Sequence, residues 1–593
     1  MYTDLKSVSI LISLLKQYEI DHIVISAGTR HIPFVFSVEQ DNFFKTYSVV
    51  DERSASFFAL GMIEKIQKPV AIVCTSGTAA CNYVSAVNEA FYQKLPLVVL
   101  TADRNQYYLN QQEEQMVMQD GLYGRAVKKT VTLPIVRDEK DAWYCSRLVN
   151  EALLEINRGE IGPVHINFPV EDNYPTSNVI FAFHTRELEK ANRISRLDVE
   201  DDLYAWKEKV EQLRKAKVMI IYGQHGKVSA EELSAINRFC KVFNCIFSVD
   251  LLSNMICDKA IFTYASVNTI SPEKLETILP DIVITMNGHT VSGIKAKLKG
   301  YSKKFKHWHI SADGTVSDPF KVQTDIIACK NTTFFNRFAE LAEQMPANDV
   351  DSYYQQWKDT IKTSGNGLSP NDCNFEFSSI YAVQQLMNRI PEGSLLHLAN
   401  SNSVRIANNF SLKKGIEVYA NRGTHGIDGS MSAFIGQASV SSELCYLIIG
   451  DLSFFYDMNA FWNRYVGKNV RILVNNNSGG GIFHSPYYQQ GEEFKRIDQH
   501  IAAEHHTSVK AWAEAVGFKY FGVSDKEQMQ DALKEFNCTS DSPMIIETFT
   551  NMDVDVDQMA EVTRQIKAYT QIGKLASSLP KPAKKTLKKM LGR

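Results

Sequence analysis

Gly450-Asp451-Leu452-Ser453 follows the apolar run Leu444–Ile449, and Asn475-Asn476-Asn477 follows the apolar run Ile472–Val474. Both runs are short and almost wholly apolar, which is typical of strands buried on both faces of a parallel sheet. The carboxyl ends of neighbouring parallel strands meet at one edge of an open α/β sheet, where ligands bind. The two segments therefore predict an α/β fold with a ligand site built from both strand ends.

The same alternation of short apolar runs and helical patterns extends through most of the chain, as expected for doubly wound α/β units. Turn residues followed by a helical pattern come after most of these runs. Further strands are expected at His22–Ile25, Val70–Val73, Leu97–Thr101, Val218–Tyr222 and Ile282–Thr285.

The length of 593 residues is too great for one hydrophobic core. Polar, strand-poor stretches around residues 185–202 and 348–374 divide the chain, and they place domain boundaries near 190 and 365. We predict three doubly wound parallel-sheet domains and a basic tail, at residues 1–190, 191–365, 366–570 and 571–593.

Composition excludes several classes of protein. A net charge of −3 and a pI near 6.6 give no electrostatic reason to expect a nucleic-acid partner. The ten cysteines form no Cys-x-x-Cys pair, no secretory signal is evident, and no apolar run approaches the roughly 20 residues that span a bilayer. We expect a soluble, cytoplasmic protein with free thiols.

The C-terminal segment 581–593 carries six basic residues and no acidic one, interleaved with Leu587, Met590 and Leu591. One interpretation is a solvated tail. The other is a basic amphipathic helix that contacts a membrane surface or a partner.

The residues at the two strand ends are suited to a hard cation. Mg²⁺ prefers oxygen ligands and shares them with phosphates. Asp451 offers a carboxylate oxygen, Asn476 an amide oxygen 25 positions later, and Ser478 a backbone carbonyl. Taken separately, the segments could equally be a turn and a loop. Together they resemble the bipartite thiamine-diphosphate motif, with Leu452 in place of its third glycine.

A second candidate is the segment Val50-Asp51-Glu52, which opens an apolar-periodic helix. Asp51 is predicted to cap this helix, and Glu52 would favour the positive end of the helix dipole. That structural role is sufficient by itself to explain why acidic residues occur at this position. The functional alternative is that Glu52 activates thiamine diphosphate, because a carboxylate bonded to the aminopyrimidine favours the tautomer that deprotonates the thiazolium.

Several further segments resemble the family of 2-succinyl-5-enolpyruvyl-6-hydroxy-3-cyclohexene-1-carboxylate synthases. That family decarboxylates 2-oxoglutarate with thiamine diphosphate and a metal ion, and it adds the succinyl carbanion equivalent to isochorismate in menaquinone biosynthesis. The similarity extends over roughly residues 3–560. It is carried by Asp51-Glu-Arg-Ser-Ala55, Cys74-Thr-Ser-Gly-Thr-Ala79, Leu100-Thr-Ala-Asp-Arg104, Asn421-Arg-Gly-Thr-His-Gly-Ile-Asp-Gly429, Gly450-Asp-Leu-Ser453 and Gly480-Gly-Ile-Phe483.

The resemblance implies roles for individual residues. Glu52 would activate the cofactor, and Ile427 would bend it into its V shape. Asp451, Asn476 and the Ser478 carbonyl would hold Mg²⁺, with Mn²⁺ as the alternative ion. Cofactor contacts are expected from Thr75, Asn82, Ser401, Ile427, Gly450, Ser453, Ile482 and Phe483.

The implied substrate contacts fall into two groups. Arg405 and Arg422 match the arginines that bind the distal carboxylate of the donor, a role that suits the planar guanidinium fork. Arg30, Arg104 and Gln115 fall where the family contacts isochorismate.

The acceptor side also departs from the family pattern. Ser26-Ala-Gly-Thr-Arg30 replaces the usual Ser-Pro-Gly-Ser-Arg, and Gly293 stands where a lysine is usual, with Lys295 and Lys297 as shifted substitutes. A paralogue with another acceptor, for example in cell-surface polysaccharide synthesis, is therefore the alternative function.

The family also implies an assembly. Its activating glutamate and its metal-binding segment lie on different subunits, so we expect a homodimer or homotetramer with active sites at the interface. Other enzyme classes find little support, since no Gly-x-Gly-x-x-Gly follows a strand and Gly223-Gln-His-Gly-Lys227 is too short for a phosphate-binding P-loop.

Overall fold

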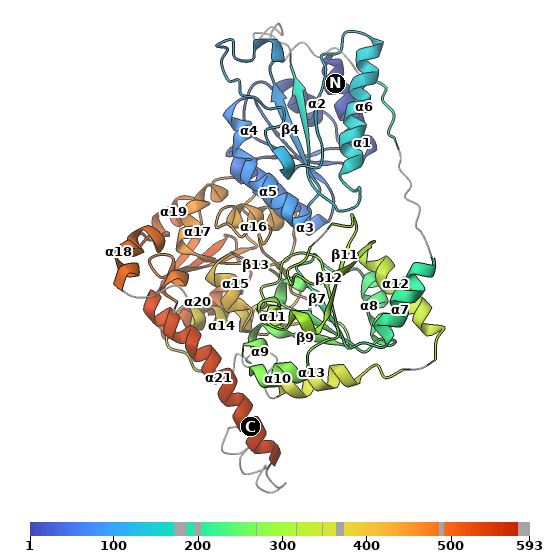
Figure 1. Cartoon of the computed structure of the whole chain (residues 1–593). Helices are drawn as coiled ribbons and strands as arrows, with labels where there is room; N and C mark the ends of the chain where they lie inside the picture. The colour runs from blue at the N-terminus through green and yellow to red at the C-terminus, as the bar shows by residue number, and fades with distance from the viewer. Residues whose placement is uncertain are drawn as a thin grey trace.

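The computed structural model describes residues 1–170, 187–194, 203–268, 270–315, 317–346, 348–362, 373–485 and 492–578. Three parallel six-stranded sheets with helices between their strands form the fold, which confirms the predicted α/β class (Figure 1). The sheets occupy residues 22–169, 218–328 and 395–549. The domain limits near 190 and 365 stay predictions. Both interpretations of residues 581–593, a solvated tail or a membrane or partner contact, concern residues outside the described ones.

The first sheet has the strand order β2-β1-β3-β4-β6-β5, with its topological switch point between β1 and β3. Its central strands are buried on both faces, which explains their continuous apolar sequence. The strands are β1 (His22–Ile25), β2 (Lys45–Ser48), β3 (Val70–Cys74), β4 (Leu97–Asp103), β5 (Thr130–Thr132) and β6 (Val164–Pro169). The helices are α1 (Lys6–Gln17), α2 (Ile32–Glu39), α3 (Glu52–Ile66), α4 (Thr78–Asn82), α5 (Val84–Gln93) and α6 (Glu139–Glu155).

The second sheet has the order β12-β11-β10-β7-β8-β9, and its switch point lies between β10 and β7. Its strands are β7 (Val218–Tyr222), β8 (Cys245–Val249), β9 (Ala260–Phe262), β10 (Ile282–Met286), β11 (Lys306–Ser311) and β12 (Gln323–Ala328). Its helices are α7 (Leu203–Arg214), α8 (Ala230–Cys240), α9 (Thr263–Val267), α10 (Pro272–Thr277), α11 (Ile294–Lys299), α12 (Asn331–Glu343) and α13 (Ser352–Lys362).

The third sheet has the order β14-β13-β15-β16-β18-β17, with its switch point between β13 and β15. Its strands are β13 (Leu395–Leu398), β14 (Glu417–Tyr419), β15 (Cys445–Gly450), β16 (Val470–Asn476), β17 (Lys519–Val523) and β18 (Met544–Phe549). Its helices are α14 (Ser379–Arg389), α15 (Asn402–Ala407), α16 (Ser430–Ser439), α17 (Asp451–Tyr456), α18 (Glu492–Ile501), α19 (Lys510–Ala515), α20 (Lys526–Phe536) and α21 (Met552–Ser578).

All seven strands expected from the sequence are present. The structure lengthens four of them by one to four residues, leaves two unchanged and shifts one, β15, by a single residue. β15 and β16 are neighbours, as predicted, and Gly450 pairs with Asn475. One detail differs from the prediction: Asn475 and Asn476 belong to β16 instead of the loop after it. They stay in the strand because they pair with Thr548 and Phe549 of β18.

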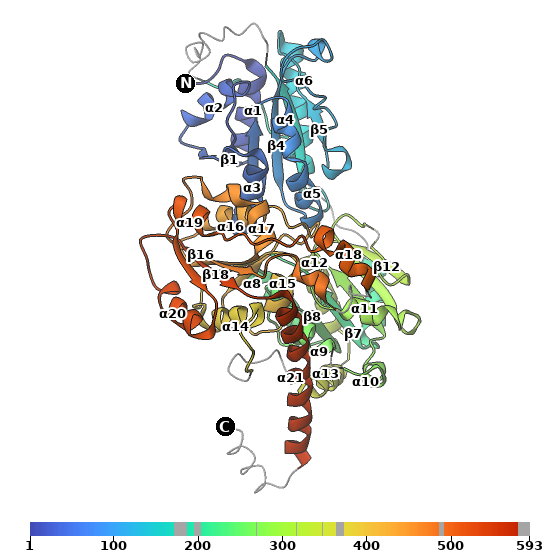
Figure 2. The same ribbon diagram turned by 90° about the vertical axis from the view of Figure 1, so that its left-hand side faces the viewer.

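Glycines allow α3 of the first domain to cross α16 of the third domain at backbone contact. A Cβ atom at Gly61 would lie 1.7 Å from the Ala433 carbonyl oxygen, and one at Gly436 would lie 2.0 Å from the Phe58 carbonyl oxygen. Side chains of both helices share one hydrophobic core. The first domain is thereby packed on the third, and Figures 1 and 2 both show α3 beside α16.

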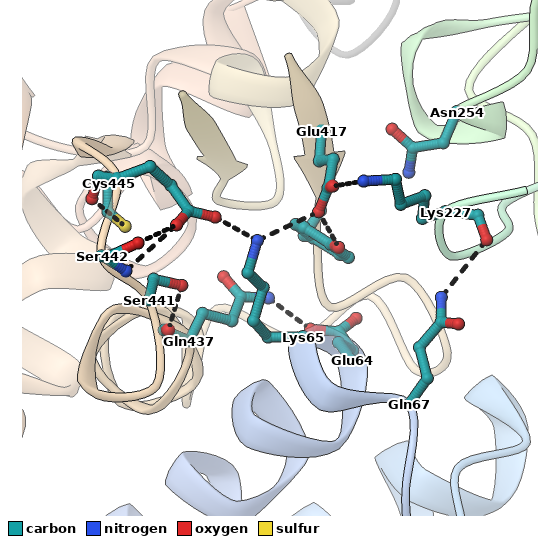
Figure 3. A network of polar contacts seen from close by, with 12 residues as sticks. Glu64, Lys65, Gln67, Lys227, Asn254, Glu417, Gln437, Ser441, Ser442 and Cys445 are labelled. Carbon is teal, nitrogen blue, oxygen red and sulfur yellow. Dashed lines mark hydrogen bonds and ion pairs between the residues drawn. The ribbon is translucent and has the colours of Figure 1, made fainter. Parts of the chain in front are cut away.

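A charged network joins all three domains near the end of α3 (Figure 3). Lys65 pairs with Glu417 and Glu443 of the third domain, and Lys227 of the central domain also pairs with Glu417, at 2.8 Å. An isolated exposed pair is worth little. Here Lys65 and Glu417 each serve two partners and are largely buried, so the network holds the three domains in one arrangement.

Helix α21 extends away from the three sheets in both views (Figures 1 and 2). Within the described parts of the chain, no helix combines the length and the apolar character that crossing a bilayer requires. Cytoplasmic location stays a prediction.

We predict that Gly61→Ala destabilises the protein, although alanine in a helix interior is ordinarily more stable than glycine by about 1 kcal/mol. The added methyl group would collide with the Ala433 carbonyl and force α3 from α16. Calorimetry should show a Tm several degrees below that of the wild type. Gly300→Ala is the matched control, since its Cβ would have its nearest neighbour at 3.6 Å. Equal Tm values for the two variants would contradict a tight crossing.

Candidate active site

Asp451 is the carboxylate at the carboxyl edge of the third sheet. It is 2 % exposed, and its Oδ1 and Oδ2 accept hydrogen bonds from the backbone N–H groups of Leu452 (2.7 Å) and Gly479 (2.9 Å). Burial raises the pKa of this carboxyl, while these backbone bonds and the nearby His505 oppose the shift. Asp451 therefore ties the start of α17 to the loop after β16.

Asn476 lies at the end of the adjacent strand with its amide orientation fixed. Its Nδ2 donates to Glu547 Oε1 at 2.7 Å and to the Thr507 carbonyl at 3.0 Å, and its Oδ1 accepts from Ser478 N–H at 3.1 Å. Ser478 itself has a φ of 68°, which turns the loop sharply. The structure thus brings the three predicted metal-binding residues together.

The donor set of these residues fits a hard cation. The carboxylate of Asp451, the amide oxygen of Asn476 and the carbonyl of Ser478 are all oxygen ligands. The Ser478 carbonyl already accepts a hydrogen bond from His505 N–H at 3.0 Å. A carbonyl oxygen has a second lone pair, so this bond leaves it able to coordinate an ion.

Gly450 and Ser453 lie at the start of α17, where backbone N–H groups suit an anion. A Cβ at Gly450 would meet no described atom within 4 Å, so a ligand can approach the backbone there. The Ser453 hydroxyl donates to the Ile427 carbonyl at 2.6 Å. Through this bond, α17 is connected to the predicted cofactor-bending residue, whose side chain is 38 % exposed.

Arg405 and Arg422 form a pair of neighbouring cations near the end of β13. Arg422 is 5 % exposed; its Nη1 donates to Asn400 Oδ1 at 2.9 Å, and its buried Nε has no hydrogen-bond partner among the described residues. Burial and then the charge of Arg405 lower the pKa of Arg422 to about 10. Arg405 donates to the carbonyl of Ser401, which has a φ of 66°. Two neighbouring guanidinium groups with a free N–H can chemically bind a carboxylate.

Glu52 is the first residue of α3, and Asp51 caps that helix as predicted, accepting from Ser54 N–H at 2.9 Å. Asn82 Nδ2 donates to Glu52 Oε2 at 3.0 Å, so these two predicted residues are together. Both line a cavity of about 420 Å³ with Ala27, Val50, Asp51, Arg53, Asn459 and Trp462.

The predicted acceptor contacts lie on loops of the first domain. Thr75 Oγ1 accepts from Arg30 N–H at 3.1 Å and packs against Gly28, where a Cβ would lie 2.4 Å from that of Thr75. The backbone of Gln115, at a φ of 55°, runs beside Gly77. Arg104 pairs with Glu113 at 3.1 Å.

Ile482 and Phe483 lie in a short 3₁₀ helix, Gly481–His484. His484 holds this helix between Asp498 of α18 (3.0 Å) and Asp553 of α21 (3.2 Å). Burial acts to lower the pKa of His484, but its hydrogen bonds to the two carboxylates outweigh this and raise it.

Comparison with known proteins agrees with this architecture. Residues 6–122 match the model "Thiamine pyrophosphate enzyme, N-terminal TPP binding domain", and residues 401–548 match the corresponding C-terminal TPP binding domain. A 2-succinyl-5-enolpyruvyl-6-hydroxy-3-cyclohexene-1-carboxylate synthase of Phocaeicola vulgatus is 38% identical over 575 residues, covering 96% of this chain and 99% of the relative. That of Bacteroides fragilis is 38% identical over 577 residues (96% and 100%), and that of Porphyromonas gingivalis 32% over 559 residues (93% and 95%).

The chain belongs to the family of 2-succinyl-5-enolpyruvyl-6-hydroxy-3-cyclohexene-1-carboxylate synthases. It carries the thiamine-pyrophosphate-binding domains of that enzyme class.

Two residues that contact the predicted metal-binding residues were missed by sequence reasoning. Glu547 is fully buried in β18 and accepts from Asn476 and from Ser508 Oγ (2.6 Å), Tyr520 OH (2.7 Å) and Val509 N–H (3.1 Å). An acidic residue inside the apolar strand Met544–Phe549 was the available signal. His505, whose Nε2 lies 3.3 Å from Asp451 Oδ2, had no comparable signal.

Glu52 is not in direct contact with the predicted metal-binding residues of the same chain. Among the described residues, no hydrogen bond or ion pair links Glu52 to Asp451, Asn476 or Ser478. Glu52 instead faces its own cavity beside Asn459 and Trp462.

Proposed function

We propose that this protein decarboxylates 2-oxoglutarate and adds the succinyl carbanion equivalent to isochorismate, as a step of menaquinone biosynthesis. The observation that carries the proposal is that two groups follow the carboxyl ends of neighbouring strands of the third sheet. The oxygen donors Asp451 and Asn476 lie after β15 and at the end of β16, and the neighbouring cations Arg405 and Arg422 lie after β13 and β14. Relatives with the corresponding name align over 96% of the chain.

Each group of residues has a separate role in this proposal. Asp451, Asn476 and the Ser478 carbonyl would hold Mg²⁺, with Mn²⁺ as the alternative ion, and this cation would neutralise the charge of the diphosphate. Gly450 and Ser453 support that diphosphate, and Thr75, Asn82 and Ser401 contact the cofactor. When bound, thiamine diphosphate supplies a nucleophilic carbon and an electron sink for decarboxylation.

The Glu52 carboxylate would accept a hydrogen bond from the pyrimidine ring of the cofactor and would favour its activated tautomer. Its position supports this role, because it accepts one hydrogen bond from Asn82 and otherwise lines an open cavity. Ile427, Ile482 and Phe483 exclude water, which would otherwise protonate the reactive carbon before the acceptor arrives.

Arg405 and Arg422 bind the distal carboxylate of 2-oxoglutarate, since the buried Arg422 has an Nε–H left to donate. Arg30, Arg104 and Gln115 bind isochorismate. For Arg104 this requires exchanging part of its pairing with Glu113 for a substrate carboxylate.

We further propose that the protein works as a homodimer or a homotetramer in which Glu52 of one copy completes the site formed by Asp451 and Asn476 of another. The exposed Val50, Tyr456 and Trp462 near the Glu52 cavity support an interface there. If all of these residues formed one site within a single chain, no contact between two copies would be needed for activity.

We predict that purified protein with Mg²⁺ and thiamine diphosphate releases CO₂ from 2-oxoglutarate and forms the succinyl-cyclohexene product when isochorismate is added. Glu52→Gln should lower kcat by 10²-fold or more, while calorimetry shows Mg²⁺-dependent cofactor binding preserved within a few-fold. CO₂ release without that product would favour the paralogue with another acceptor. Full activity of Glu52→Gln would remove the role given to Glu52.

Glu547→Gln should weaken Mg²⁺ binding by about 10- to 100-fold, as is typical when a group that orients a metal ligand is lost. A glutamine has only one acceptor oxygen and so cannot serve the four donors now held by Glu547. Titration of Mg²⁺ into the cofactor-loaded protein measures this. Glu535→Gln, an exposed residue paired with Lys519, is the control. Equal Mg²⁺ affinities in the two variants would contradict the orienting role.

Mixing inactive Glu52→Gln and Asp451→Asn proteins, with subunit exchange, should restore about a quarter of wild-type activity, because half of the dimers are mixed and each mixed dimer has one intact site. No restoration after demonstrated exchange would show that each site lies within a single chain.

A further inference from the structure

Two histidines meet where the central domain faces the third domain. His289 follows β10 at the switch point of the second sheet, and His425 lies in the segment 421–429, which also carries Arg422. Their ring centroids are 4.8 Å apart in an edge-on arrangement. Gln224 N–H donates to the His289 carbonyl at 3.0 Å, which ties this loop to the end of β7.

The backbone holds His425 in an uncommon conformation. Its φ is 62°, in the left-handed region that non-glycine residues adopt uncommonly, although histidine adopts it more often than most. Glu89 fixes the preceding residues by accepting from Gly423 N–H (2.9 Å) and Thr424 N–H (2.7 Å), and Asn400 holds the Gly426 carbonyl at 2.7 Å. Such over-determined strain is typical of functional positions. Both residues are nevertheless accessible from solvent, although neighbouring atoms partly desolvate their rings.

The charges around the pair are mainly positive. Arg422 acts on both rings, Arg405 on His425 and Lys295 on His289, while Glu89 is the opposing carboxylate at His289. Asp250 opposes Lys295 and Arg422. Glu89 and Asp250 are themselves engaged in backbone hydrogen bonds, so the positive field is only partly offset.

The protonation of the pair reflects this field. Desolvation, and then the charges of Arg422 and its neighbours, lower the pKa of His425 to about 4. Desolvation and then Lys295 lower the pKa of His289. Both rings are therefore neutral at pH 7 when no anion is bound, and an incoming negative charge would favour their protonation.

We propose that His289 and His425, together with Lys295, form a second anion subsite that binds a carboxylate of isochorismate. The inference rests on the proposed function, in which Arg405 and Arg422 are occupied by the donor. The family usually has a lysine where this chain has Gly293. In this chain the positive charge for the acceptor carboxylate would come from Lys295 and from protonation of the two imidazoles.

The subsite couples acceptor binding to proton uptake. Because a bound carboxylate raises the pKa of the two imidazoles, isochorismate binds more tightly as pH falls from 8 to 6. Donor binding to the two arginines, which keep their charge over this range, does not follow the same dependence.

The test is calorimetric titration of isochorismate into protein loaded with thiamine diphosphate and Mg²⁺, without 2-oxoglutarate, in two buffers of different ionisation enthalpy. Wild-type protein should take up protons on binding, with a Kd about tenfold lower at pH 6 than at pH 8. His289→Asn and His425→Asn should each raise the Kd at pH 6 by about tenfold, and the double variant should take up no protons.

Two controls separate binding from general damage. His506→Asn, at a side chain that is 84% exposed, should behave as wild type. CO₂ release from 2-oxoglutarate without acceptor should change less than twofold in every variant.

Three results would overturn the subsite: unchanged isochorismate binding in both histidine variants, proton uptake that persists in the double variant, or CO₂ release that falls as much as acceptor binding. Wild-type protein that does not bind isochorismate would overturn both the subsite and the proposed acceptor. Absence of CO₂ release from wild-type protein would instead overturn the proposed donor chemistry.

Discussion

The arrangement of the site depends on the backbone contact between α3 and α16. Gly61 and Gly436 have no side chain at the crossing, and each faces a carbonyl oxygen of the opposite helix. α3 begins with Glu52, and α16 follows the segment that carries Arg422 and Ile427. The close packing of the two helix backbones therefore fixes the position of Glu52 relative to the segment that carries Arg422 and Ile427. The Lys65–Glu417 network adds a polar restraint at the far end of α3.

Much of the fold could be predicted because its signals are local. Buried parallel strands leave continuous apolar runs, and Val218–Tyr222 or His22–Ile25 can be delimited from such runs alone. The neighbouring placement of Asp451 and Asn476 followed from the rule that parallel strand ends share an edge. The Asp51 cap is likewise encoded within four residues. The activating role of Glu52 was suggested by its position and supported by the family resemblance, the roles of Arg405 and Arg422 came from that resemblance, and all three remain proposals.

The rest could not be predicted because it depends on contacts between distant segments. Asn476 is oriented by Glu547, 71 positions away, so its orientation has no local signature. The end of β16 was placed too early because asparagine suggests a loop, whereas pairing with β18 keeps Asn475 and Asn476 in the strand. The meeting of His289 and His425 across two domains is of the same kind.

The residues proposed for the metal and those proposed for the acceptor occupy different kinds of structure. Asp451 and Asn476 lie at the ends of buried strands, where a change disturbs the sheet, whereas Arg30, Arg104 and Gln115 lie on loops. Loops accept substitution and insertion more readily than strand ends. After gene duplication, a descendant of this chain could therefore exchange its co-substrate by altering its loops while retaining the decarboxylating machinery intact.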